Sequence, residues 1–426
     1  MSCIYCFYSE SFQKSLMMKC ESIDRFEDKL KKYRDLFISE MQQIVSIEKC
    51  DCTYRKNATD IKELIEWTED LRSNMQKKEA VMRKIFNEVI EIYELFLLQK
   101  NTEAEKKMQK IVSRKHISLN KEPLTIQNKM FYRGRKISDI ELYFKDKYDY
   151  YHIPFNKREK VGNQRFSAHG QPMLYLGQSI ICCQKELELD DKNLSVAAFT
   201  FKKGSLKIYE LRNQMYNSIA RSLYPIINAG LKLNYWKSKI EPNGNSLKRD
   251  LEKTILFQIL TFPTQKKDAF IPEYTLPQIF TKNIFQSGYD GISYQSTKNY
   301  DELVNENIYS DYKMNLVLFT HYNENASYDD ELLKKINIIT VDCEIQNIME
   351  KYSFEKLEEF IKSIGIDDYT DIDSENCKNT IMITKLQLDY LKDAKINNID
   401  YFSTIQGKKE IYFLIKYVES ISSYRY

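Results

Sequence analysis

The 426-residue sequence contains no long apolar run and no secretory leader pattern. A membrane-spanning helix needs roughly 18 to 20 consecutive apolar residues, and no segment approaches that length. The first ten residues, M-S-C-I-Y-C-F-Y-S-E, lack the basic segment and the apolar core of a signal peptide. We therefore expect a cytoplasmic protein without a membrane partner.

Net charge is also nearly absent, because 64 basic side chains are balanced by 61 acidic ones to give +3. No global field favours nucleic acid as a partner, so any basic site must be local. Only 14 of the basic residues are Arg, yet four of them fall within 33 residues. Since Arg binds phosphate and carboxylate in a bidentate way, the cluster indicates either an anion site or salt bridges to nearby acids. The cluster is Arg133, Arg135, Arg158 and Arg165, and the acids are Asp139, Glu141, Asp146 and Asp149.

A disulfide framework is not expected, because the nine Cys lie in a large, lysine-rich chain without a signal peptide. They should be free thiols or metal ligands. Hydrophobic residues form 42% of the chain, which is enough for buried cores. The length corresponds to two or three domains of about 150 residues.

Residues 1–122 are predicted to form a helical module. Apolar residues recur every three or four positions over residues 22–47 and again over about 60–109, which is the pattern of amphipathic helices. Four cysteines flank the first helix, as Cys3-x-x-Cys6 and Cys50-x-Cys52. Four thiolates can hold zinc tetrahedrally, so they predict a structural zinc site with Cys20 left over. Plain thiols packed between helices are the alternative.

Residues 123–325 change to short strands and turns after the break at Lys121-Glu122-Pro123. Residues 196–201 and 206–211 are predicted to form a β-hairpin. Residues 326–426 are expected to form a small α/β extension without a site, closed by a strand at 410–418. A strand is expected at 131–135, and it should end in a turn at Gly134. Further strands are expected at 173–176, 291–294, 315–320 and 336–341. Helices are expected at 246–260, 276–286, 329–335, 354–364 and 384–394.

The stretch from Arg165 to Glu186 combines a loop, a strand and a capped helix. Ser179 is a suitable N-cap for a helix whose Ile180, Cys183 and Leu187 point inward. Glu186 then lies two turns along this helix. An acid at that place is either a solvated surface residue or a placed catalytic carboxylate.

Five short elements follow one another in the middle of the chain. They are Y-R-G-R around Arg133, R-F-S-A-H-G from Arg165, Tyr175 with Glu186 eleven positions later, Pro277-Gln278, and D-G-I-S-Y-Q-S ending at Ser296. In this order they resemble the RES domain, a family named for an Arg, a Glu and a Ser and found in bacterial toxin components. The sequence departs from the family at Gln164, where Gly is common, and in a longer span near residues 212–250. Arg135 is a second candidate for the first Arg of the pattern.

The resemblance implies an α+β architecture in which the helical module precedes an ADP-ribosyltransferase-like mixed α/β domain and the C-terminal extension. It also implies that NAD is the substrate and that the nicotinamide–ribose bond is cleaved by a glycohydrolase or phosphorylase, as in a toxin or anti-phage effector. Departure of nicotinamide leaves an oxocarbenium-like sugar, which a carboxylate can stabilise.

The resemblance also implies a role for each matched residue. Glu186 would stabilise the sugar, Arg133 and Arg165 would bind the pyrophosphate, and Tyr132 would lie beside Arg133 in the binding site. Tyr175 would contact the nicotinamide ribose, and Ser296 would donate to a phosphate or ribose oxygen. The alternatives are that Tyr175 is a core residue, Ser296 caps a turn and Arg165 bridges to an Asp.

The helical module with its cysteines resembles the HEPN-like regions that precede some RES domains. Many HEPN ribonucleases use an Arg and a His with four to six residues between them. None of His116, His152, His169 and His321 follows an Arg at that spacing, so a scaffold or sensor is expected instead.

Three functions remain open: NAD degradation, ADP-ribosylation of a protein, and a non-enzymatic interaction module with a degenerate RES domain. An uncontrolled NAD-degrading enzyme would kill its host. We therefore also expect restraint by an antitoxin, a regulatory protein or a homo-oligomer.

Overall fold

A computed structural model of the chain has an α+β fold and divides into two compact units, each assembled from three segments. Unit 1 comprises Met1–Lys121, Asn163–Ala168 and Leu211–Ser287, and unit 2 comprises Glu122–Gly162, His169–Glu210 and Gly288–Tyr426. The predicted break at Lys121-Glu122-Pro123 lies outside the described residues. The structure describes residues 2–52, 62–114, 126, 129–137, 146–190, 193–202, 206–216, 219, 245–264, 268–298, 311–341, 345–363, 375–392, 394–396 and 398–422.

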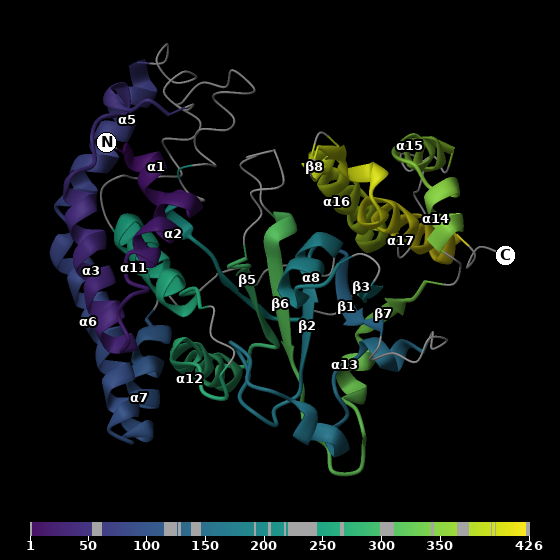
Figure 1. The fold of residues 1–426 in the computed structure, drawn as a ribbon, viewed down its shortest axis with the longest axis horizontal. Helices are drawn as coiled ribbons and strands as arrows, with labels where there is room; N and C mark the ends of the chain where they lie inside the picture. The colour runs from purple at the N-terminus through teal and green to yellow at the C-terminus, as the bar shows by residue number, and fades with distance from the viewer. Residues whose placement is uncertain are drawn as a thin grey trace. The chain divides into compact units, whose positions relative to one another are not determined.

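Among the described residues, the regular elements that lie wholly within unit 1 are helices (Figure 1). They are α1 (Ile4–Tyr8), α2 (Glu10–Met18), α3 (Phe26–Gln42), the short η1 (Ile47–Lys49), α5 (Lys62–Gln76), α6 (Glu79–Leu97), α7 (Asn101–Val112), α11 (Asn245–Leu260) and α12 (Pro272–Gln286). Helix α6 contacts α3, α7 and α11, and the rings of Tyr33, Phe37 and Phe86 meet edge to face in the core. The predicted helices of the N-terminal module are confirmed, although α3 is shorter than expected and the second block divides into three helices.

Unit 2 is built on a seven-stranded sheet with the order β4-β5-β6-β2-β1-β3-β7. The strands are β1 (Phe131–Lys136), β2 (Met173–Gly177), β3 (Leu194–Phe201), β4 (Ile208–Leu211), β5 (Gly291–Gln295), β6 (Met314–Phe319) and β7 (Ile336–Ile339). Neighbours from β5 to β7 pair antiparallel. The amide of Asp290 donates to the Lys207 carbonyl at 2.8 Å, so β4 and β5 start side by side and run parallel. The sheet is therefore mixed.

The sheet is weakly joined between β1 and β2. Strand β1 pairs with β3 along its whole length, and β2 pairs likewise with β6. Between β1 and β2, in contrast, the ladder consists of the single pair Tyr132 and Gly177. Because side chains alternate along a strand, Tyr132 and Arg133 leave β1 on opposite faces at this junction.

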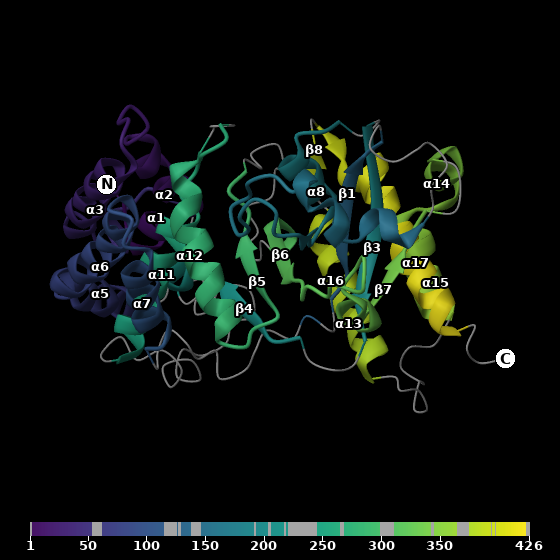
Figure 2. The ribbon, with the colours of Figure 1, turned by 90° about the horizontal axis from the view of Figure 1, so that it is seen from below.

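One face of the sheet is covered by helices α8 (Ile180–Leu187) and α17 (Ile405–Ser422), which share an apolar core with Tyr132, Val196 and Ala198 (Figure 2). Phe131, Leu174 and Leu316 belong to the core of the opposite face. The remaining elements of unit 2 are η4 (Lys147–Tyr150), η5 (Phe155–Lys160), η7 (Asp311–Lys313), α13 (Asp330–Lys334), α14 (Ile345–Lys351), α15 (Phe354–Ser363), α16 (Glu375–Leu391), β8 (Lys395–Ile396), β9 (Ile399–Asp400) and η9 (Tyr401–Ser403).

Two predicted elements are wrong. The hairpin at 196–211 does not form, because β3 is an inner strand that pairs with β1 and β7, whereas β4 lies at the far edge beside β5. The closing strand at 410–418 is part of helix α17. Its continuous apolar run fits a buried strand or a buried helix equally well, and here the run is enclosed by the sheet and by other helices. The other predicted strands are confirmed, and β1 continues through Gly134 instead of turning there.

Candidate active site

Helix α8 begins where the sequence predicts and lies close to the sheet. The Ser179 hydroxyl accepts a hydrogen bond from the Cys182 amide at 3.1 Å and donates one to the Tyr312 carbonyl at 2.7 Å. Gly134 and Gly177 make the close approach possible, because a Cβ atom at either position would lie 3.3 Å or less from atoms of α8. Leu187 was expected to point inward but is 44% exposed, since the helix ends there.

Glu186 meets two polar side chains, one from strand β6 and one from the residue that follows β5. Its Oε1 atom accepts a hydrogen bond from Ser296 Oγ at 2.6 Å and a second from Asn315 Nδ2, also at 2.6 Å. The carboxylate is half-buried, and its Oε2 atom has no hydrogen-bond partner among the described residues. One oxygen is thus fixed by the protein while the other stays available to a ligand.

Both donors to Glu186 are themselves held in place. Ser296 Oγ accepts from the Lys298 amide at 3.2 Å, and the Ser296 amide donates to the Lys313 carbonyl at 2.8 Å. The Cys182 thiol donates to Asn315 Oδ1 at 3.2 Å. The amide group of Asn315 therefore points its nitrogen at Glu186.

Asn315 was not predicted as a site residue. It is a polar residue in the otherwise apolar strand M-N-L-V-L-F, which was the available signal. Its register opposite Gly177 places its side chain on the face of the sheet that α8 covers. Tyr175 lies two residues before Gly177, so its half-buried side chain leaves the same face.

Helix α17 holds the N-terminal end of α8. Glu410 Oε1 accepts from the Ile180 amide at 2.6 Å, and Gln406 Nε2 donates to Gln184 Oε1 at 2.9 Å. Burial raises the pKa of Glu410 to about 7. Sequence reasoning missed Glu410 because it placed residues 410–418 in a strand, and it assigned no site to the segment before that strand, which contains Gln406.

Among the described residues, Arg133 is a buried cation without a buried counter-ion. Its side chain is 8% exposed, and Nη1 donates to the Tyr175 carbonyl at 3.0 Å across the weak junction of β1 and β2. Its Nε atom is buried and has no hydrogen-bond partner in the part of the chain that the structure describes. Burial lowers the pKa of Arg133 well below its ordinary value. Within the described residues, Arg133 makes no ion pair or hydrogen bond with Glu186.

Tyr132 lies in the apolar core on the α8 side of the sheet, where its ring packs against Phe413. Burial raises the pKa of Tyr132 well above its ordinary value. The predicted role of Tyr132 in binding a cofactor stays a prediction. Tyr132 is a core residue, and it directly precedes Arg133 in β1.

Arg165 belongs to unit 1 and is 9% exposed. Its Nη1 atom donates to the carbonyls of Phe262 at 2.9 Å and Leu260 at 3.3 Å, and its guanidinium lies 5.0 Å from the centre of the Tyr274 ring. The loop that carries Arg165 is held by Gln278 of the predicted Pro-Gln helix. Gln278 Nε2 donates to Asn163 Oδ1 and to the Gln164 and Ser167 carbonyls.

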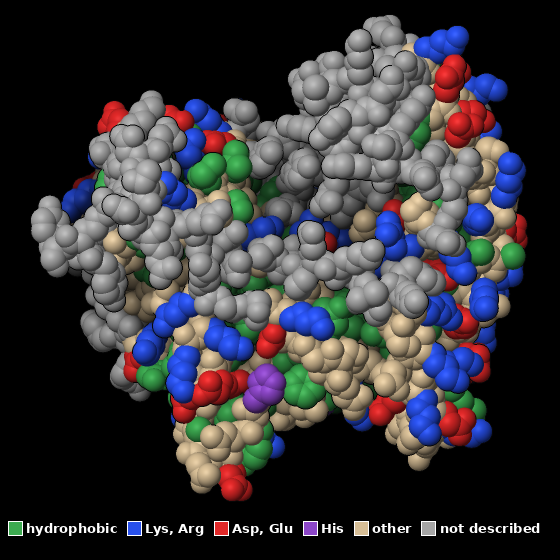
Figure 3. Space-filling model, turned by 180° about the vertical axis from the view of Figure 1, so that it is seen from behind, with side chains coloured by type: hydrophobic (Ala, Val, Ile, Leu, Met, Phe, Trp, Pro, Cys, Tyr) green, Lys and Arg blue, Asp and Glu red, His purple; other side chains and the backbone are tan. Residues whose placement is uncertain are grey.

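The alternative that the arginine cluster forms surface salt bridges receives no support from the described part of the chain. Arg133, Arg158 and Arg165 have carbonyl oxygens or aromatic rings as partners there and no carboxylates. Asp139 and Glu141 lie outside the described residues. On the face shown in Figure 3, basic and acidic side chains are interspersed over much of the described surface.

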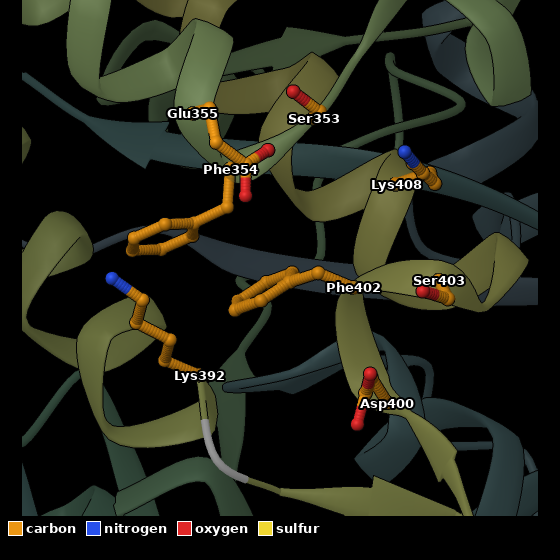
Figure 4. A pocket seen from close by; sticks show the side chains of 8 residues that line it. All are labelled: Ser353, Phe354, Glu355, Lys392, Asp400, Phe402, Ser403 and Lys408. Carbon is orange, nitrogen blue, oxygen red and sulfur yellow. The ribbon is translucent and has the colours of Figure 1, made fainter.

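The four predicted zinc ligands come together in unit 1. The sulfur atoms of Cys3, Cys6, Cys50 and Cys52 all lie within 4.8 Å of one another. A separate pocket lies among the C-terminal helices of unit 2, where the rings of Phe354 and Phe402 pack at a tilt of 32° near Lys392 (Figure 4). None of the predicted site residues lines this pocket.

The chain resembles a toxin protein over part of its length. It is 32% identical over 187 residues to a protein of Bacillus subtilis (strain 168) that carries the name "Putative toxin YopC". The alignment covers 43% of this chain and 40% of that protein, so less than half of either chain is compared. No protein-family model and no solved structure matches the chain. Within the described residues, no helix combines the length and the apolar character needed to cross a bilayer.

Proposed function

We propose that this protein is an NAD-degrading toxin that cleaves the bond between nicotinamide and ribose. The observation that carries the proposal is the hydrogen bond between Ser296 and Glu186, two residues that lie 110 positions apart and that the RES resemblance pairs in one site. The similarity to a protein named as a toxin supports the toxin part of the proposal. An antitoxin or another regulatory protein is the partner that such an activity requires.

The chemistry follows from the arrangement around Glu186. As the bond from the ribose carbon to the pyridinium nitrogen breaks, nicotinamide leaves with the bonding electron pair and the sugar becomes positively charged. The Oε2 atom of Glu186, which has no partner among the described residues, can stabilise that charge, while Ser296 and Asn315 hold Oε1 in place. Water or phosphate then forms the new carbon–oxygen bond and releases a proton.

Arg133 keeps its predicted anion-binding role in the proposal, although its side chain starts on the face of the sheet opposite to Glu186, because its Nη1 atom reaches the Tyr175 carbonyl at the weak junction of β1 and β2. A guanidinium removed from water without a counter-ion is costly, and a bound pyrophosphate would offset that cost through charge-assisted hydrogen bonds. The buried Nε atom without a partner provides a further donor for such a ligand or for a bound water. Arg165, the second buried guanidinium, belongs to unit 1, and its predicted role as a pyrophosphate ligand stays a prediction.

The proposal is tested by incubating the purified chain with NAD and separating the products, in buffers with and without phosphate. We expect release of free nicotinamide, with ADP-ribose as the second product if water is the acceptor and a phosphorylated ADP-ribose if phosphate is. ADP-ribose that is recovered on protein instead would identify a protein ADP-ribosyltransferase. NAD that stays intact and unbound with the folded chain would contradict all three enzymatic versions and favour a non-enzymatic module.

The matched variants are Glu186→Gln and Glu188→Gln. Gln at position 186 keeps an oxygen for Ser296 and Asn315 but removes the negative charge, so we expect NAD consumption to fall at least about 100-fold. Glu188 is exposed and accepts from Lys298 Nζ at 2.8 Å, outside the Ser296 and Asn315 contacts. Glu188→Gln should therefore keep its activity within about twofold. Equal activity of the two variants would rule out a catalytic role for Glu186.

A further inference from the structure

Four thiols converge at the N-terminal end of unit 1. Cys3 and Cys6 lie at the start of α1 and within it, whereas Cys50 and Cys52 follow η1, so two distant segments contribute two residues each. Cys3 and Cys50 are buried, and Cys6 and Cys52 are half-buried. Cys20 is also buried but lies outside the group, because its thiol donates to the Leu16 carbonyl.

The spacing of the sulfur atoms is that of a tetrahedral metal site. Cys3 Sγ lies 3.8 Å from Cys52 Sγ, and Cys6 Sγ lies 3.7 Å from Cys50 Sγ. A zinc ion with four sulfur ligands at about 2.3 Å gives edges of about 3.8 Å between the sulfur atoms. These distances are much longer than the S–S bond of about 2.05 Å in a disulfide. The backbone supports the arrangement, since the Val45 amide donates to the Ser2 carbonyl at 3.1 Å.

We propose that Cys3, Cys6, Cys50 and Cys52 bind one structural zinc ion that fixes helix α1 in unit 1. Four thiolates in a tetrahedron favour zinc over harder cations, and a site without an open position is structural and not catalytic. The proposal is independent of the NAD chemistry, because it involves none of the residues around Glu186.

The zinc site also controls a segment far along the chain. Helix α1 carries Tyr5 between two of the ligands, and the Tyr5 hydroxyl lies 2.9 Å from the Tyr216 hydroxyl, with their ring centres 5.5 Å apart. Asn213 Nδ2 donates to the Tyr8 carbonyl at the other end of α1, at 2.9 Å. A metal that orders α1 therefore also orders the segment that follows β4.

The experiment is metal analysis of the full chain, purified without a polyhistidine tag and without added metal. We expect about one zinc ion per chain, released by a mercurial that titrates thiols. After replacement of zinc by Co²⁺, the absorption spectrum should show the bands of a tetrahedral four-thiolate site. Iron in place of zinc, or a metal-free chain whose four thiols are either free or joined in disulfides, would overturn the proposal.

Three alanine variants provide the matched comparison. Cys6→Ala and Cys52→Ala should each lose most of the bound zinc, whereas Cys20→Ala removes a buried thiol outside the group and should keep it. Equal zinc content in all three would overturn the assignment of ligands. If the ligand variants do not fold, the proposal is tested on the unmutated chain. Removing zinc from that chain should increase amide hydrogen exchange at residues 213–216. Unchanged exchange there would overturn the link between the metal and that segment.

Discussion

At the scale of single residues, the hydrogen bonds from Ser296 and Asn315 fix the position of the Glu186 carboxylate. Removing either donor by Ser296→Ala or Asn315→Ala takes away one hydrogen bond of 2.6 Å to a charged group. Such a bond contributes about 1.5 to 3 kcal/mol, so we expect NAD consumption to fall about 10- to 100-fold in each variant.

The matched control for this prediction is Ser296→Thr, which keeps a hydroxyl at the same place and should retain more activity than the alanine variant. Rates are compared at saturating NAD, so that a loss of binding is not counted as a loss of chemistry. Full activity of Ser296→Ala and Asn315→Ala would show that the position of Glu186 does not depend on these donors.

The sequence allowed part of this residue-scale geometry to be predicted. Glu186 and Ser296 could be paired in advance because each belongs to a short element of the family pattern. Asn315 could not, because its contact with Glu186 depends on the register of β6 opposite β2, and register is a tertiary property. Tyr132 and Arg133 were predicted to act together, yet alternation along β1 sends their side chains to opposite faces.

At the scale of elements, the close packing of α8 on the sheet is open to test. A Cβ atom at Gly177 would lie 3.0 Å from Cys183 Sγ and 3.2 Å from the Cys183 amide nitrogen. Gly177→Ala must therefore displace α8, and we expect a loss of about 1 to 3 kcal/mol in the free energy of unfolding, together with lower activity.

Gly162→Ala is the control for this prediction, because no atom lies within 4 Å of a Cβ atom built there. Chemical denaturation followed by circular dichroism measures both variants. A similar stability of the two variants would mean that α8 does not need the space that Gly177 leaves.

The contact of α17 with α8 predicts a pH dependence of stability. The pKa of Glu410 is raised by burial from 4.5 to about 7, so between these values the folded chain keeps a proton that the unfolded chain has lost. Stability must then fall as pH rises through this window, by about 3 kcal/mol in total for a shift of this size. Glu410→Gln keeps an oxygen for the Ile180 amide and removes this contribution.

The measurement is the melting temperature of the natural chain and of Glu410→Gln between about pH 4.5 and 7. The decrease with rising pH should be smaller in the variant by the amount that Glu410 contributes. Glu419→Gln, at an exposed position of the same helix, should behave like the natural chain. Parallel curves for all three chains would mean that Glu410 is not protonated in the folded state.

Periodicity predicted most of the elements, and its two failures have different causes. Amphipathic helices such as α3 and α6 were visible because one face of each is polar. The run around Glu410 was read as a strand because a segment buried on all sides has no polar face to reveal its period. The hairpin prediction failed because nearness in sequence does not fix which strand lies next to which.

At the scale of the whole molecule, each of the two units is built from segments that are not consecutive in the chain. Residues 326–426 were predicted to be a separate extension, whereas β7 extends the sheet of unit 2 and α17 shares its core. The interleaving of segments could not be predicted, because it depends on which distant surfaces bury one another and not on any local pattern.

This arrangement predicts that a chain ending at residue 325 does not fold. Truncation would remove β7 and expose the apolar side of β1 and β3 that α17 covers, including Tyr132 and Val196. We expect an insoluble or poorly ordered product, measured by soluble yield and by the dispersion of its amide resonances. A well-folded product would show that residues 326–426 are a true appendage.

The contact between Glu410 and the start of α8 also sets an order of events during synthesis. Glu186 leaves the ribosome long before Ser296 and Asn315, and the helix that carries it receives its last contact only when α17 has been made. At about 5 to 20 residues per second, the 224 residues from Glu186 to Glu410 take about 10 to 45 seconds to translate. A nascent chain would lack Ser296 and Asn315 for about the first half of that time and the contact with α17 for all of it. The proposed activity would therefore begin only with the finished protein.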